Sequence, residues 1–145
     1  MDKTADIAKY QLEDIEPGLT RQFKVAITEE MCNEFAKFTG DYSPLHMDEE
    51  YAKNNSIFDR RICHGLMLAS FFSRLIGMHL PGENSLLVSH SVKYMMPAYI
   101  GDVITVKGIV LDKSNATRMI TLRTIINNGS DKCLIDGQAK VIVRQ

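Results

Sequence analysis

The sequence lacks a surplus of charge of either sign. Its 145 residues include 17 lysines and arginines against 18 aspartates and glutamates, which gives a net charge of −1. A chain that binds a polyanion needs an excess of positive charge, so we expect no nucleic-acid partner. The balance leaves room for a local basic patch that contacts one phosphorylated ligand. Lys93, Arg60, Arg61 and Lys107 are candidates for such contacts.

Cysteine is also scarce. The three cysteines, Cys32, Cys63 and Cys133, are odd in number and widely spaced. They form neither the paired pattern of a disulfide framework nor a CxxC motif. We therefore expect reduced thiols in a cytoplasmic protein.

Long hydrophobic runs are absent as well. The most apolar window, Gly65–Gly77, is interrupted by Ser70, Ser73 and Arg74, and it is much shorter than a bilayer span. The chain begins with an acidic segment, residues 1–6, that no apolar run follows, so we expect no signal peptide. Neither feature supports a role in a membrane.

What remains is the composition of an ordinary globular domain, with 45% hydrophobic and 24% charged residues. Alternating apolar residues predict a strand over Arg21–Thr28. A short helix is expected between the cap Thr28 and Gly40, and another after the cap Asp48. The further predicted segments are a loop at Asp41–Met47, a main helix at His64–Met78, and strands at Leu87–Met96, Asp102–Leu111, Thr117–Ile126 and Cys133–Val143.

The main helix is apolar on nearly every side, which is typical of a buried helix. The four strands that follow it are expected to form a meander, with the Asn128-Gly129 pair in one of its hairpins. These features predict an α+β domain in which an antiparallel sheet curls around one buried helix. Such a small sheet leaves open edges, and pairing with a second copy would cover them, so we expect a homodimer.

The segment Asp41–His46 holds the first candidate chemistry. It places a carboxylate and an imidazole five residues apart on a turn that Pro44 stiffens. Two such groups aimed at one point can hold a water molecule and move a proton to or from it. The alternative is structural: Asp41 caps a turn and His46 is a buried, hydrogen-bonded side chain.

Gly65 is the second candidate, because it lies in the first turn of the main helix. A glycine lets another group approach the backbone closely, and the first N–H groups of a helix have no partner within it. Such an N–H can stabilise negative charge that develops on a carbonyl oxygen. Alternatively, Gly65 only relieves crowding where the helix meets the sheet.

Three motifs in this order resemble those of the MaoC-like, R-specific enoyl-CoA hydratases. Asp41–His46 (DYSPLH) resembles the signature D-x-N-P-x-H, and Arg61–Ser70 (RICHGLMLAS) resembles the helix motif P-I-V-H-G-M-L-L-A-S. Pro97 with Gly101-Asp102 resembles the P-x-x-x-G-D junction of that family. The likeness runs from about Phe23 to the end of the chain.

The resemblance implies a hotdog fold, with residues 1–145 as one MaoC-like domain, and a function. That function is the reversible hydration of trans-2-enoyl-CoA to (R)-3-hydroxyacyl-CoA by a homodimer, with no cofactor and no metal. The resemblance assigns the activation of water to Asp41 and His46 and a structural role to His64. It also implies that the Gly65 N–H donates to the thioester oxygen. The remaining substrate-binding residues that we expect are Ser73, Tyr42, Ser43 and Leu68.

Two residues depart from the family motifs. Ser43 stands where the family usually has Asn, so a hydrogen bond in the loop is expected to be lost or rerouted. Arg61 stands where it usually has Pro, which is expected to loosen the segment before the helix or to place a cation near the site entrance.

Several alternatives stay open at this point. An acyl-carrier-protein dehydratase would use the same chemistry on another carrier. A hotdog thioesterase usually has an acidic residue on its central helix, and Leu66–Met78 contains none. A non-catalytic acyl-CoA-binding module would need neither Asp41 nor His46. A metal site lacks ligand spacing, and a buried Cys63 would be an inert thiol rather than a nucleophile.

Overall fold

The computed structural model describes residues 6–145. The expectation about a signal peptide concerns mainly residues 1–5, which lie outside the described part of the chain. Within residues 6–145, no helix is long and apolar enough to cross a membrane. The elements in chain order are η2 (Leu12–Asp14), β1 (Thr20–Ala26), α1 (Glu29–Thr39), α2 (Pro44–Met47), α3 (Glu49–Asn55), α4 (Gly65–Arg74), η3 (Leu75–His79), β2 (Ser85–Tyr94), β3 (Val103–Ser114), β4 (Met119–Asn127) and β5 (Cys133–Val143).

All five strands form one antiparallel sheet in the order β1-β3-β4-β5-β2. The predicted meander is therefore correct for β3, β4 and β5 and wrong for β2, which pairs with β5 at the far edge. The reason lies in the connection between β2 and β3. It contains Pro97 and Gly101 and spans residues 95–102, so it crosses the domain instead of closing a tight hairpin.

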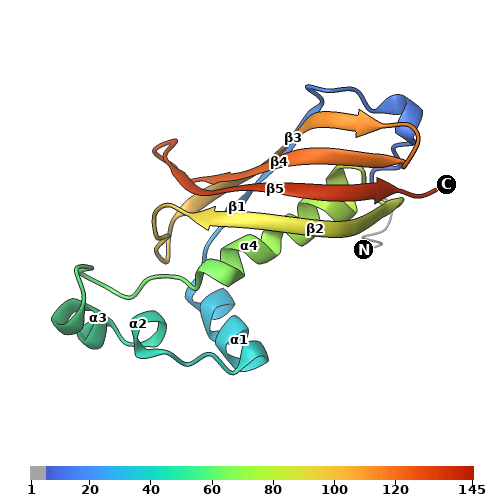
Figure 1. The fold of residues 1–145 in the computed structure, drawn as a ribbon. Coiled ribbons are helices and arrows are strands. Elements are labelled where there is room, and N and C mark those ends of the chain that lie inside the picture. Colours follow the sequence, from blue (N-terminus) through green and yellow to red (C-terminus); the bar gives the residue numbers. More distant parts are fainter. Residues whose placement is uncertain (1–5) are drawn as a thin grey trace.

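The α4 helix runs beneath this sheet, as Figure 1 shows, and the sheet and α4, together with residues 61–64 that lead into the helix, form what we call the body. Met67, Leu68 and Phe72 are at most 4% exposed and pack against the inner face of the strands. An antiparallel sheet curled over a central helix is the hotdog fold, so the predicted α+β architecture is confirmed.

The expectation that this helix is buried on every side is wrong. Leu66 is 69% exposed, and Ser70, Ser73 and Arg74 are exposed as well. The five strands of one chain cover only one side of α4, which leaves the opposite face uncovered. The helix also changes its winding near the end, since the π-helical turn η3 follows α4.

The local signals at the ends of α1 and α3 act as predicted. The Thr28 side chain accepts a hydrogen bond from the Met31 N–H at 3.2 Å, and Gly40 ends α1 with a left-handed φ of 80°. The Asp48 side chain caps α3 through the Tyr51 N–H at 3.0 Å. The predicted loop Asp41–Met47 differs, because Pro44 starts the four-residue helix α2 within it.

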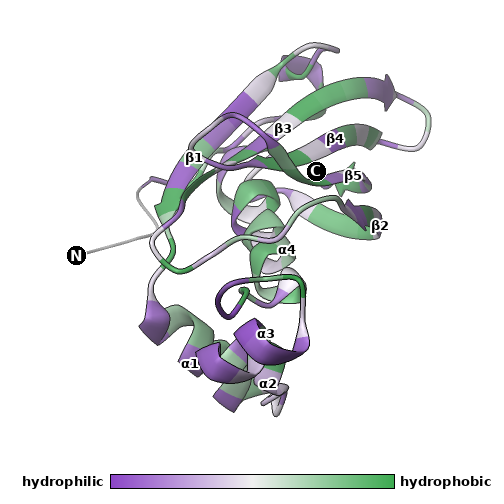
Figure 2. Cartoon of the chain, turned by 90° about the vertical axis from the view of Figure 1, so that its left-hand side faces the viewer, coloured by the Kyte–Doolittle hydropathy of each residue, from purple (hydrophilic) through white to green (hydrophobic). Residues whose placement is uncertain are grey.

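The segment 41–60, with α2 and α3, extends from the end of α4 and away from the sheet (Figure 1). We call it the excursion. Figure 2 shows that α3 is hydrophilic and α4 is hydrophobic. Among its residues only Ala52 is buried. Apolar burial therefore contributes little to holding the excursion in place, and polar contacts with the body stabilise its position instead.

Candidate active site

The loop that carries the predicted pair is ordered by hydrogen bonds between backbone N–H groups and nearby side chains. Asp41 Oδ1 accepts a hydrogen bond from the Ser43 N–H at 3.1 Å, and the Asp41 N–H donates to Thr39 Oγ1 at 3.2 Å. Ser43 occupies the N-cap position of α2 without a side-chain cap bond. The contact expected from an Asn at this position is therefore absent in α2, and the carboxylate of Asp41 orders the turn instead.

A short segment of the body, residues 61–65, runs antiparallel to this loop, and we call it the strap. Its Ile62 holds the loop on both sides: the Ile62 N–H donates to the Leu45 carbonyl at 3.2 Å, and the Ile62 carbonyl contacts His46 Nδ1 at 2.9 Å. A carbonyl oxygen can only accept, so Nδ1 carries the proton. In the neutral ring, Nε2 of His46 then keeps a free lone pair, as a general base requires.

Arg61 ties the strap to the far end of α2. Its guanidinium donates to the Met47 carbonyl at 3.2 Å and lies 3.7 Å from a carboxylate oxygen of Glu29 on α1. Its side chain is only 8% exposed. The expectation that Arg61 loosens the strap or lies at an entrance is therefore wrong, and burial also removes it from the candidate phosphate contacts. The planar guanidinium reaches two elements at once.

His64 completes the strap. Its Nε2–H donates to the Asp41 carbonyl at 3.0 Å, across 23 positions of sequence. Its ring stacks on His46 with the centroids 4.3 Å apart. Hydrogen bonds from the strap thus reach the loop at residues 41, 45, 46 and 47.

A cavity of about 280 Å³ lies where the strap meets the start of α4 and the end of β2. His46, Gly65 and Leu68 all line it, so the structure brings these three predicted site residues together. Most of the wall is apolar, as an acyl chain requires. The other lining residues are Phe58, Ile62, Cys63, Tyr94, Met95, Met96, Pro97 and Ile135.

Gly65 is the first residue of α4, so its N–H has no acceptor within the helix. The ring of Tyr94 packs against it so closely that a Cβ at this position would lie 2.9 Å from two ring carbons. Glycine is thus the residue that this packing accommodates. It also leaves the backbone N–H close to the cavity.

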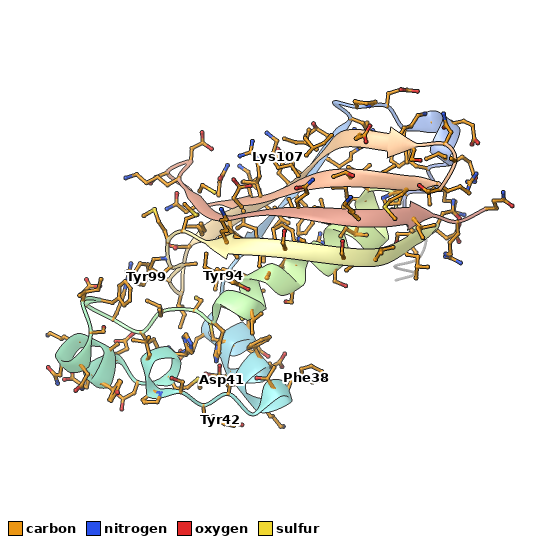
Figure 3. All side chains as sticks on the ribbon, in the orientation of Figure 1. Phe38, Asp41, Tyr42, Tyr94, Tyr99 and Lys107 are labelled. Atoms are coloured by element: carbon orange, nitrogen blue, oxygen red, sulfur yellow. The ribbon has the colours of Figure 1, made fainter. Side chains whose placement is uncertain are left out.

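The other predicted site residues do not line this cavity. Asp41 and Tyr42 lie on the loop after α1, below the sheet that carries Lys107 (Figure 3). Tyr42 is 58% exposed. Ser43 is engaged through its backbone, and Ser73 is exposed on the uncovered side of α4. Asp41 is connected to the cavity through the strap, because His64 holds its carbonyl.

A buried thiol pair lies beside the strap. Cys32 Sγ of α1 is 3.7 Å from Cys63 Sγ, and all three cysteines of the chain are free, as expected. The contact with Cys63 lowers the pKa of Cys32 to about 7, and the charge of Arg61 acts in the same direction. Hydrogen bonding to Cys32 and burial raise the pKa of Cys63, which therefore stays a protonated thiol near neutral pH.

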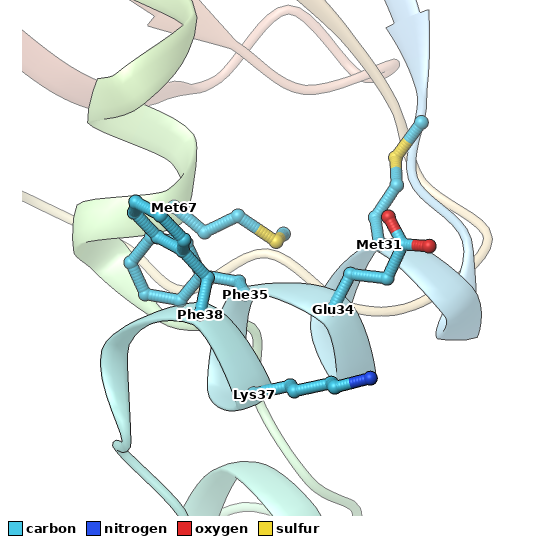
Figure 4. A pocket seen from close by; sticks show the side chains of 6 residues that line it. All are labelled: Met31, Glu34, Phe35, Lys37, Phe38 and Met67. Carbon is cyan, nitrogen blue, oxygen red and sulfur yellow. The ribbon is translucent and has the colours of Figure 1, made fainter.

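A larger hollow, of about 810 Å³, lies between α1 and α4 (Figure 4). Met31, Phe35, Phe38 and Met67 give it an apolar floor, with Glu34 and Lys37 at its side. Of the predicted site residues none lines it. His46 and Gly65 line the smaller cavity and neither lines this hollow, so the smaller cavity is the candidate active site.

Sequence reasoning missed several residues of the site. Tyr94 was not singled out, because a tyrosine at the end of a strand carries no motif. The hydrogen bonds of the strap were not foreseen either, since all four acceptors are backbone carbonyls, which no side-chain motif identifies. Within residues 6–145, no cluster of three or more His, Cys, Asp or Glu side chains is arranged to hold a metal ion.

Comparison with known proteins agrees with this architecture. The family model described as MaoC like domain matches residues 13–128, and the chain belongs to this family. An "(R)-specific enoyl-CoA hydratase" of Rhodospirillum rubrum is 34% identical over 142 residues, which cover 95% of this chain and 94% of the relative. A "3-hydroxybutyryl-CoA dehydratase" of Methylorubrum extorquens is 35% identical over 131 residues, covering 90% and 82% of the two chains.

The solved structures show the same likeness in three dimensions. The (R)-hydratase from Aeromonas caviae involved in PHA biosynthesis superimposes with a TM-score of 0.87 at 30% identity. The match covers 90% of this chain and 98% of that one. The shared fold therefore extends over nearly the whole of both molecules.

Proposed function

We propose that this chain catalyses the reversible hydration of trans-2-enoyl-CoA to (R)-3-hydroxyacyl-CoA. The observation that carries the proposal is that His46 and Gly65 line one cavity with apolar walls. These residues supply a basic nitrogen and a backbone donor, which are the two groups that addition of water to an enoyl thioester needs. The named activities of the relatives support the same reaction.

In the proposed reaction the thioester carbonyl withdraws electrons through the double bond and makes C3 electrophilic. His46 Nε2 accepts a proton from a water molecule that it holds together with Asp41, and the water oxygen forms a bond to C3. The electron pair of the double bond moves toward the thioester oxygen. The enolate then takes a proton at C2 from the same pair, on the face that the water attacked.

The negative charge on the thioester oxygen needs a donor at the moment when it develops. We assign this role to the Gly65 N–H, which lies at the positive end of α4. Removing one such donor typically raises a reaction barrier by about 3–4 kcal/mol. Leu68 on the next turn, with Ser73, Tyr42 and Ser43, is proposed to complete the binding of the substrate.

A homodimer is part of the proposal. The strand β2 is an edge of the sheet, and its Leu86, Leu87 and Val88 are about half exposed. Leu66 exposes a further apolar side chain on the uncovered side of α4. A second copy that pairs along this edge would cover these side chains and the free N–H and C=O groups of the strand. A monomer in light scattering at micromolar concentration would contradict this.

The remaining parts of the proposal concern the whole chain. We take residues 1–145 as one MaoC-like hotdog domain in the cytoplasm, acting on an acyl-CoA thioester without a cofactor or a metal ion. The acyl carrier protein is the alternative carrier. A comparison of kcat/KM for the same enoyl group on CoA and on acyl carrier protein distinguishes the two.

The test is the hydration of crotonyl-CoA, followed as loss of the absorbance of the enoyl thioester, with chiral analysis of the product and a parallel reaction in EDTA. We expect the R product, formed at the same rate with and without EDTA. The S product, or activity that EDTA abolishes and zinc restores, would contradict the proposal. Release of free CoA thiol would identify a thioesterase, and binding without turnover a binding module.

A further inference from the structure

His64 is a buried polar side chain that the proposed reaction does not use. It is 2% exposed and lies on the strap between Cys63 and Gly65, yet it does not line the cavity. Burying an imidazole removes it from water, and that costs free energy unless its polar atoms gain partners. Its contacts therefore require an explanation.

The ring of His64 contacts both residues of the proposed pair, Asp41 and His46, and also Phe35 of α1. Nε2 contacts the Asp41 carbonyl at 3.0 Å, and one face stacks on His46 at 4.3 Å with 29° between the planes. Phe35 of α1 packs against the ring in a tilted arrangement at 5.0 Å. One side chain thus touches both Asp41 and His46.

The hydrogen bond also determines the form of the ring. Because the carbonyl only accepts, Nε2 carries the proton, and Nδ1 of the neutral ring has a lone pair. The Nδ1 atom is buried and has no partner among the described residues. If the ring only filled space, a phenylalanine could replace it and would avoid the unsatisfied Nδ1.

We infer that His64 is a positioning residue, which sets the distance between Asp41 and His46 by bonding the backbone of one and stacking on the ring of the other. This inference rests on the proposed function. His64 is also the residue before Gly65, so the same ring ties the pair to the proposed donor of the thioester oxygen. Misplacing a reacting group by about 1 Å can cost about 10²-fold in rate.

Two substitutions separate the contacts. His64→Phe keeps the size and stacking of the ring and removes the N–H, so Asp41 loses its anchor. His64→Gln keeps an N–H at a similar reach and loses the ring. In His64→Phe we expect kcat for crotonyl-CoA to fall roughly 10- to 100-fold, while KM changes less than about threefold. In His64→Gln we expect kcat to recover at least about half of that loss on a logarithmic scale.

The strongest test combines His64→Phe with Asp41→Asn. If His64 acts through Asp41, the addition of His64→Phe to the Asp41→Asn variant should lower kcat by less than a further factor of about two. His90→Phe serves as the control, because His90 is a partly buried histidine that bonds Thr124 far along the sheet, and it should keep the kcat of the wild type. A wild-type kcat in His64→Phe, or an equal loss in both backgrounds, would overturn the inference.

A failure of His64→Phe to fold would not end the test. The side chain of His64→Asn is one methylene group shorter than that of His64→Gln, so its N–H does not reach the Asp41 carbonyl. The kcat of His64→Asn should therefore fall as expected for His64→Phe, while His64→Gln stays active. Equal kcat values in the Asn and Gln variants would overturn the inference. Should the wild type not hydrate crotonyl-CoA at all, the proposed function fails by itself. The carbonyl ¹³C shift of Asp41 then still reports the bond, which His64→Gln retains and His64→Asn loses.

Discussion

The body and the excursion are held by different forces. In the body, two clusters of buried apolar side chains pack against the sheet, one around α4 and the other around Ile76 of η3 and the N-terminal residues Leu12 and Ile15. In the excursion, α2 has no buried residue and α3 has only Ala52. What holds the excursion is a set of hydrogen bonds from the strap, including the one that the buried Arg61 donates to the Met47 carbonyl. Apolar burial stabilises the body by far more than a few such bonds stabilise the excursion.

The comparison teaches that stability and chemistry are assigned to different parts of this chain. Asp41 and His46 belong to the excursion, whereas the proposed site residues Gly65, Leu68 and Ser73 belong to α4. A substitution in one region should therefore affect one property and leave the other nearly unchanged. The predictions below test this separation.

The largest effect is expected for Asp41→Asn and His46→Gln. Each should lower kcat by a factor on the order of 10²–10⁴, the usual contribution of a positioned acid–base group. The double variant should be little worse than the worse single one, because groups that act as a unit are not additive. Steady-state hydration of crotonyl-CoA and thermal unfolding of the same samples provide the measurements. Wild-type activity in either single variant removes that residue from the mechanism.

The opposite result is expected for Leu122→Ala in the body. Leu122 is fully buried on β4, so truncation should lower the free energy of unfolding by about 2–5 kcal/mol. Below the unfolding transition kcat should stay within about twofold of the wild type. Leu111→Ala is the matched control, since Leu111 is 47% exposed and its truncation should cost less than about 0.5 kcal/mol. Denaturant titration measures both.

Arg61→Met tests the border between the two regions. It removes the donor to the Met47 carbonyl and the partner of Glu29. We expect a moderate loss of both properties, about 1–2 kcal/mol in unfolding and about tenfold in kcat. Arg60→Met is the control from the neighbouring position, where the side chain is half exposed and stacks over Tyr99. An Arg61→Met variant with unchanged kcat would show that the loop keeps its place without this bond.

The smallest effect concerns pH. Burial lowers the pKa of His90, whose Nε2 contacts Thr124 Oγ1 at 2.9 Å. The folded state then binds fewer protons than the unfolded state below about pH 6.5, so the free energy of unfolding decreases as the pH falls through that value. The decrease should be smaller in His90→Gln. Denaturant titrations of both proteins between about pH 7.5 and about pH 5 measure the difference, and parallel curves would contradict it.

Much of the body could be predicted from the sequence, because apolar patterns and caps are local signals. The strand at Thr20–Ala26, the helix α1 between Thr28 and Gly40, and three strands of the meander follow from them. The position of β2 could not be predicted this way. Its pairing with β5 joins residues between 41 positions apart (Tyr94 and Ile135) and 58 positions apart (Ser85 and Val143), and neither strand carries a pattern that identifies its partner.

The site was predictable to a similar extent. The motifs predicted His46, Gly65 and Leu68, and these three meet in the cavity, while Ser73 and Tyr42 lie outside it. The role of Arg61 was interpreted wrongly, because the family pattern has proline there and a sequence does not reveal that a cation will be buried against a carbonyl. A hydrogen bond to a backbone carbonyl does not depend on the side chain of the accepting residue, so residue types alone do not predict it.

The hydrogen bonds of the strap have a consequence for motion. A region with almost no buried apolar surface can separate from its neighbour by breaking a few bonds, while the strands stay paired. The amide protons of α2 and α3 should then exchange with solvent deuterium through local opening, at rates that do not change with mild denaturant. Those of β3, β4 and β5 should exchange only when the entire domain unfolds. The part of the chain that carries Asp41 and His46 would thus open and close many times during the lifetime of a single folded sheet.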